Sequence, residues 1–172
     1  MDIQLQRVAG NLSDHYDPRS KTLRLSEGVA NGTSVAAAAI AAHELGHAIQ
    51  DAEEYLPLKF RSALVPAVNI GSYLGWILIM IGLFLNFVDL AWLGVAIFSG
   101  GALFALATLP VELNASARAK VLLADTGIIQ TEQERRGVNT VLNAAALTYV
   151  AALVTAVLQL LYYASLLVGR RR

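Results

Sequence analysis

The sequence predicts a mainly α, multi-pass membrane protein, with three transmembrane helices and a small α+β portion outside the membrane. Hydrophobic residues make up 56% of the 172 residues and charged residues only 15%, whereas soluble chains are about 25% charged. Three stretches, residues 62–88, 90–111 and 137–169, contain no charged side chain. Because about 20 apolar residues in a helix cross a bilayer core of about 30 Å, each stretch is long enough to span it.

The expected spans differ in the residues that would pack or anchor them. The first, at about residues 64–85, contains Gly71, Gly75 and Gly82, small residues that let membrane helices approach closely. The second runs over about residues 90–109, with a possible packing or kink site at residues 99–101. The third lies within about residues 141–168, where Tyr162 and Tyr163 fit an interfacial aromatic belt.

The polar residues before the first span predict short strands and one helix. Residues 4–8 and 21–26 alternate between polar and apolar side chains, as strands do, and could form a hairpin or a three-stranded edge. Residues 14–19 are typical of a turn. Residues 31–34 offer a helix N-cap, and an alanine-rich helix is expected from residue 35 to about residue 54.

Composition excludes several kinds of site. The chain has no cysteine, so disulfides, thiolate chemistry and Cys-ligated zinc are excluded, and a metal site must be built from His, Asp and Glu. Thirteen acidic and 13 basic side chains balance, which gives no argument for a nucleic-acid partner. Residues 1–25 are polar and contain no apolar segment of the kind found in a signal peptide.

The expected helix at residues 35–54 contains an HExxH motif, His43-Glu44-Leu45-Gly46-His47. Histidines four residues apart lie on one helical face, so both imidazoles can reach one zinc ion. Glu44 can then take a proton from the water that zinc activates. A solvated helix face with paired His and Glu is the alternative, but the small residues before the motif and the presence of only three histidines in the chain favour a metal site.

A catalytic zinc site needs a third protein ligand, and Glu112 is the best candidate. The first two spans form a hairpin, which would return Glu112 to the membrane face that carries the HExxH helix. Pro110 is expected to break the chain from the second span, so that a new helix starts there. A simpler alternative is an acidic side chain stabilised at a helix N-terminus. Three other acidic residues are alternatives: Asp51, Glu53 and Glu54. Asp51 shares the helical face of the histidines, whereas Glu53 and Glu54 are expected to be solvated.

Several segments resemble the YugP-type membrane zinc metallopeptidases. They are residues 7–19 (RVAGNLSDHYDPR), 23–26 (LRLS), the HELGH block, 58–66 (LKFRSALVP) and 110–116 (PVELNAS). The resemblance covers nearly the whole chain and implies a multi-pass peptidase of the gluzincin type, whose zinc site is completed by a downstream glutamate. It implies that His43, His47 and Glu112 bind Zn²⁺ and that Glu44 is the general base.

The sequence departs from this family pattern in two places. Members usually carry an additional N-terminal membrane helix, which this sequence does not contain. Many gluzincins also have an aspartate four residues after the ligand glutamate, where this chain has Ser116. We therefore expect another group to orient the histidine that such an aspartate would hold.

These observations predict a membrane-bound zinc endopeptidase that acts on peptide or protein substrates, including membrane proteins. Residues 1–61 would form a juxtamembrane catalytic portion, 62–111 a transmembrane hairpin, 112–140 the segment with the third ligand, and 141–172 the third span and a basic C-terminus. A non-enzymatic membrane scaffold with a structural metal is the alternative, and Glu44 distinguishes the two because a structural site needs no base. A protease that cuts inside the membrane is disfavoured, because the apolar run at residues 35–42 is too short.

Substrate-binding groups are less well defined by the sequence. Zincin proteases commonly add an extended substrate to an edge strand, so the strand at residues 23–26 would place Arg24 along that edge. A plain edge strand, protected by its charged side chains, is equally compatible. Four residues are candidates to stabilise the oxyanion of the transition state, and none stands out: His15, Tyr16, Asn114 and Arg118.

Basic residues favour a cytoplasmic active site in a cell membrane. On the opposite side, the link at residues 86–89 has no basic residue and the C-terminus has three arginines, at positions 170–172, which oppose this placement. Six basic residues lie close to the spans on the predicted catalytic side: Lys59, Arg61, Arg118, Lys120, Arg135 and Arg136. Loops rich in Lys and Arg remain in the cytoplasm. The lipid bilayer is therefore an expected partner, whereas the sequence predicts neither the substrate nor the oligomeric state.

Overall fold

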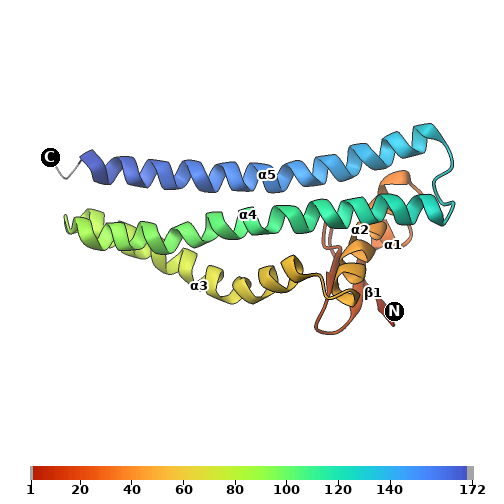
Figure 1. Ribbon diagram of the computed structural model, residues 1–172, viewed down its shortest axis with the longest axis horizontal. Helices are drawn as coiled ribbons and strands as arrows, with labels where there is room; N and C mark the ends of the chain where they lie inside the picture. Colours follow the sequence, from red (N-terminus) through yellow and green to blue (C-terminus); the bar gives the residue numbers. More distant parts are fainter. Residues whose placement is uncertain (1, 170–172) are drawn as a thin grey trace. The chain divides into compact units, whose positions relative to one another are not determined.

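A computed structural model describes residues 2–169 (Figure 1). The described chain is mainly helical with a small sheet, as predicted, and its elements are β1 (Gln4–Val8), β2 (His15–Asp17), β3 (Thr22–Ser26), α1 (Glu27–Ala30), α2 (Val35–Ala52), α3 (Leu56–Phe84), α4 (Val88–Asp125) and α5 (Glu132–Val168). Helices α3, α4 and α5 are each long and apolar enough to cross a membrane. The three predicted spans therefore fall on these three helices.

The chain divides into two compact units. The first unit comprises Met1–Lys59 and Pro110–Leu147, so it contains the sheet, α1, α2, the C-terminal part of α4 and the N-terminal part of α5. The second unit comprises Phe60–Leu109 and Thr148–Arg172, and it contains most of the apolar length of the three long helices. The HExxH motif and Glu112 both belong to the first unit.

The sheet has the strand order β1-β3-β2, with β3 in the centre. Strand β3 pairs in parallel with β1 and antiparallel with β2. The prediction that residues 23–26 form an edge strand open to substrate is therefore wrong, because both sides of β3 are already paired. Burial agrees, since Leu23 and Leu25 are buried whereas β1 is largely exposed.

Residues 15–17 form strand β2 and not the turn predicted for residues 14–19. Side chains at both ends of β2 hold it against β3. The Asp14 carboxylate accepts hydrogen bonds from the amide and hydroxyl of Ser26, and Asp17 accepts one from the Arg24 guanidinium at 2.8 Å. The turn is confined to the residues after Asp17, where Lys21 has a φ of 50°.

Helix α2 begins where its cap was predicted. The Ser34 side chain accepts a hydrogen bond from the amide of Ala37, which satisfies one of the free donors of the first turn. Small side chains then let α2 pack closely. Its alanines join residues of α4, of α5 and of the segment between them in the core of the first unit: Ala39, Ala42, Ala119, Leu123, Ile129, Val138 and Leu142. The alanine-rich sequence of α2 is thus explained by packing.

Glycines bring α3 and α4 close together in the second unit. A Cβ on Gly82 would lie 2.5 Å from the Ala91 nitrogen, and one on Gly94 would lie 2.6 Å from the Ile79 nitrogen. Ile79 and Ala91 are fully buried in this unit's core. Gly75 and Gly82 of the first span therefore have the predicted packing role, because a Cβ on either would collide with the neighbouring helix. A Cβ on Gly100, in the second span, would have no atom within 4 Å.

Helix α4 continues through Pro110, which corrects the prediction that Pro110 ends the second span and starts a new helix. Proline lacks the amide hydrogen that a helix interior uses and crowds the preceding turn. Long membrane helices tolerate it where neighbouring groups satisfy the freed carbonyl. Glu112 therefore lies within one continuous helix, and not at a helix N-terminus.

Candidate metal centre

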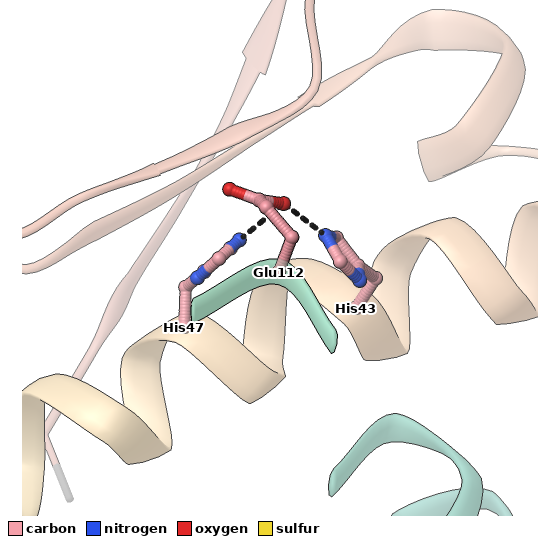
Figure 2. A group of neighbouring side chains, drawn as sticks. All are labelled: His43, His47 and Glu112. Carbon is pink, nitrogen blue, oxygen red and sulfur yellow. Dashed lines mark hydrogen bonds and ion pairs between the residues drawn. The ribbon is translucent and has the colours of Figure 1, made fainter. Parts of the chain in front are cut away.

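His43 and His47 lie one turn apart on α2 and project on the same side of the helix (Figure 2). Their ring centroids are 4.9 Å apart, and the rings are nearly perpendicular. This arrangement follows directly from the four-residue spacing in a helix. The sequence alone therefore brings the two imidazoles together.

Glu112 of α4 meets both histidines. Its Oε2 atom lies 3.2 Å from His43 Nε2 and 3.5 Å from His47 Nε2, as Figure 2 shows. The Glu112 residue is only 2% exposed. A buried carboxylate is costly unless charged or polar groups compensate it, so this position calls for a positively charged partner.

The donor atoms fit a zinc ion. Zinc holds imidazole nitrogens at about 2.0–2.1 Å and carboxylate oxygens at about 2.0–2.2 Å in a tetrahedron, so ligand atoms of one site lie about 3.3–3.5 Å apart. The two separations between Glu112 Oε2 and the imidazole nitrogens, 3.2 and 3.5 Å, match that edge length, and all three ligand atoms lie within 4.8 Å of one another. Two imidazoles and one carboxylate also form the ligand set of catalytic zinc sites, which leave a fourth position open. The group of His43, His47 and Glu112 could therefore hold a metal ion.

Each histidine has a second polar contact on the ring nitrogen that faces away from Glu112. Ser116 Oγ lies 3.1 Å from His43 Nδ1, and Gln50 Oε1 lies 3.0 Å from His47 Nδ1. The sequence predicts that a residue other than Ser116 orients the histidine. This prediction is wrong for His43, because the Ser116 hydroxyl itself contacts the His43 ring. Sequence reasoning missed Gln50, although its position three residues after His47 places it on the same helical face.

Glu44 lies beside the two histidines and is half-buried. Its Oε2 accepts a hydrogen bond of 3.0 Å from the backbone amide of Tyr16 in β2. Burial raises the pKa of Glu44 above its ordinary value, although the imidazoles of His47 and His43 and the Tyr16 amide oppose the rise. A carboxyl with a raised pKa is suited to act as a base near neutral pH.

The pKa of His47 is also raised. Burial lowers it, but the contact with Glu112 outweighs that effect, and Glu44 adds to the rise. Without a metal, this pair therefore attracts a proton. Because imidazole must be neutral to bind zinc, metal binding at this site is expected to release protons and to weaken as the pH falls.

Asp51 does not serve as a partner of the histidines. It accepts hydrogen bonds from Lys21 Nζ at 2.6 Å and from the Tyr16 hydroxyl at 2.8 Å. These contacts hold the C-terminal part of α2 against β2 and the turn that follows it. Asp51 therefore has a role in joining the helix to the sheet.

The four candidates for oxyanion stabilisation all have other contacts. The Tyr16 hydroxyl donates to Asp51, and the His15 ring contacts the Ser13 carbonyl oxygen at 2.8 Å. Arg118 pairs at 2.7 Å with Glu53, whose side chain stays exposed as predicted. Arg118 also donates to the Asn114 side-chain oxygen. The described side chains thus single out no residue for this role.

Gly46, inside the motif, allows α2 and α4 to approach until their backbones touch. A Cβ on Gly46 would lie 2.5 Å from the Ala115 carbonyl oxygen and 3.1 Å from its Cα. These are backbone atoms, so no side chain can move aside. This close approach lets Glu112, which lies three residues before Ala115, reach the histidines.

Replacing Gly46 by alanine is therefore expected to force the two helices apart and to destabilise the first unit by about 1–3 kcal/mol. Thermal unfolding of the purified protein in detergent measures the loss, and zinc binding should weaken in parallel. Gly28→Ala is the matched control, since nothing lies within 4 Å of that added Cβ. Equal melting temperatures for Gly46→Ala and the wild type would contradict the close contact.

Comparison with known proteins agrees with this site. The model of a family described as "Putative neutral zinc metallopeptidase" matches residues 1–168. The chain belongs to this family. A curated relative, the "Putative membrane protease YugP" of Bacillus subtilis (strain 168), is 43% identical over 170 residues, which cover 99% of this chain and 75% of the relative. No solved structure matches the chain.

Membership of a zinc metallopeptidase family supports zinc as the metal for the His43, His47 and Glu112 group. The name of the relative and the three apolar helices together support a membrane protein.

Proposed function

We propose that this family member is a membrane-bound, zinc-dependent endopeptidase of the gluzincin type. The observation that carries the proposal is the meeting of Glu112 with both HExxH imidazoles at separations that suit one tetrahedral ion. His43, His47 and Glu112 hold the zinc, and Glu44 is the general base. The substrates are peptides or proteins, including membrane proteins, that reach the site beside the bilayer.

The chain's own residues have distinct tasks in peptide hydrolysis. Zinc held by the three ligand residues would supply Lewis acidity, which polarises a carbonyl and lowers the pKa of water to about 7. Glu44 takes the proton from the attacking water and then passes it to the amide nitrogen of the leaving group. The Tyr16 amide holds the Glu44 carboxylate in place through its 3.0 Å hydrogen bond. The Ser116 and Gln50 contacts orient the two imidazoles.

Removal of the metal tests the proposal directly. Purified protein treated with a chelator is expected to lose casein or peptide hydrolysis, and stoichiometric zinc is expected to restore it. Magnesium should not restore it, because Mg²⁺ prefers oxygen ligands in an octahedral arrangement. Hydrolysis that survives complete zinc removal would overturn the proposal.

The alternative of a scaffold with a structural metal receives less support. A structural site has four protein ligands and no open position, whereas the described residues bring together three. A structural site also has no use for a half-buried carboxylate such as Glu44 next to its ligands.

We place the active site on the cytoplasmic side, because basic residues are concentrated near the spans in the segments that join the HExxH helix, α4 and α5. The cysteine-free chain allows a clean test with single-cysteine variants and a membrane-impermeant maleimide. Glu132→Cys, at the first residue of α5, is expected to be protected in intact cells. Phe87→Cys, between α3 and α4, is expected to be labelled, and the reverse pattern would invert the orientation.

A further inference from the structure

Gln50 is a buried polar side chain in a motif helix that otherwise buries alanine and glycine. It is fully buried, and its amide makes three hydrogen bonds. A buried amide that lost a partner would cost about 1–3 kcal/mol. The three contacts together therefore determine how the amide is oriented.

The partners of Gln50 fix which end of the amide faces which neighbour. Its Nε2 lies 2.8 Å from the Val111 carbonyl oxygen and 2.9 Å from Asn114 Oδ1. A backbone carbonyl can only accept a hydrogen bond, so the amide nitrogen must face Val111. The amide oxygen must then face His47 Nδ1, at 3.0 Å.

This orientation decides where His47 carries its proton. The Gln50 oxygen can only accept, so Nδ1 of a neutral His47 must donate. We propose that Gln50 is a positioning residue that fixes His47 in the Nδ1–H tautomer and so keeps the Nε2 lone pair available to the metal. The role of that lone pair rests on the proposed function. His43 has no equivalent device, because the Ser116 hydroxyl can either donate or accept.

The far side of Gln50 is anchored to the helix turn that carries Glu112. Val111 precedes Glu112, and Asn114 follows it by two residues. Asn114 Oδ1 also accepts from Arg118 Nε at 2.8 Å, which fixes the Asn114 oxygen toward both donors. Gln50 thereby couples the ring of one ligand to the backbone beside another, across the contact between α2 and α4.

Two replacements separate positioning from packing. Gln50→Met keeps the length of the side chain but cannot accept from His47. Gln50→Glu keeps an acceptor for His47 and places its carboxylate against the Val111 and Asn114 oxygens, so it should destabilise the fold while preserving the tautomer. Gln133→Met, at an exposed position of α5, is the matched control.

The experiment is ¹⁵N NMR of ¹⁵N-histidine-labelled, zinc-free protein, at a pH raised until the His47 ring is neutral, combined with zinc affinity from chelator competition. The chain has only three histidines, so single replacements assign the signals. The wild type, Gln50→Glu and Gln133→Met are expected to show His47 as the Nδ1–H tautomer. Gln50→Met is expected to populate the Nε2–H form and to bind zinc about 10–100-fold more weakly.

Three results would overturn the inference. They are an Nε2–H tautomer of His47 in the wild type, an unchanged tautomer and zinc affinity in Gln50→Met, and equal losses of zinc affinity in Gln50→Met and Gln50→Glu. If Gln50→Met does not fold, an Nε2–H tautomer of His47 in the wild type or in Gln50→Glu would still overturn the inference. The tautomer is measured without zinc or substrate, so its outcome is independent of whether the protein hydrolyses peptides.

Discussion

Replacing Glu44 by glutamine is expected to lower the rate of peptide hydrolysis by about 10²–10⁴-fold, the usual contribution of a positioned general base. Glutamine matches the shape of glutamate, and its amide oxygen can still accept the hydrogen bond from the Tyr16 amide. It cannot take a proton from water at neutral pH. The loss should therefore appear in kcat, measured with a fluorogenic peptide or casein and the zinc-loaded protein.

Zinc content and melting temperature should stay close to those of the wild type in this variant, since Glu44 does not belong to the group that could hold the metal. Glu54→Gln is a suitable control, because the Glu54 side chain is 77% exposed and pairs with the exposed Lys59 at the surface. Unchanged hydrolysis by a zinc-loaded Glu44→Gln protein would remove Glu44 from the mechanism. Loss of zinc together with activity would reassign it to metal binding.

Replacing Glu112 by glutamine is expected to weaken zinc binding by more than the roughly 10–100-fold typical of losing a group that only orients a ligand. The amide keeps the volume of the carboxylate in a site that is 2% exposed. It removes the negative charge and the anionic oxygen that lies within 3.5 Å of both imidazoles. Chelator competition gives the affinity, and hydrolysis at limiting zinc should fall with it.

Asp125→Asn is the control in the same helix, at an exposed position near its C-terminus. It makes the same kind of change, from carboxylate to amide, without touching the histidines, and should bind zinc as the wild type does. If Glu112→Gln retains wild-type zinc affinity, the third ligand must lie elsewhere, and the proposed site loses its basis. Excess zinc that restores hydrolysis in Glu112→Gln would instead agree with weakened binding alone.

Interactions between distant residues explain where sequence reasoning failed. The alternation at residues 21–26 predicted a strand, and β3 forms there, but its central position depends on a parallel pairing with β1 that no local pattern indicates. Pro110 has a strong local signal for a helix end, yet α4 passes through it. Ser116 stands where many gluzincins have an aspartate, and its hydroxyl contacts His43.

Features that depend on composition or on neighbours along one helix follow from the sequence. The apolar lengths required helices that could cross a membrane, and the spacing of His43 and His47 placed both imidazoles on one face of α2, because backbone hydrogen bonds repeat every 3.6 residues. The contact of Glu112 with that face, across 69 residues from His43, becomes apparent in the folded protein. The same holds for Gln50, which lies between His47 and the turn beside Glu112. Both depend on how closely α2 packs against α4 at Gly46, a contact whose geometry arises from side chains and backbone far apart in the sequence.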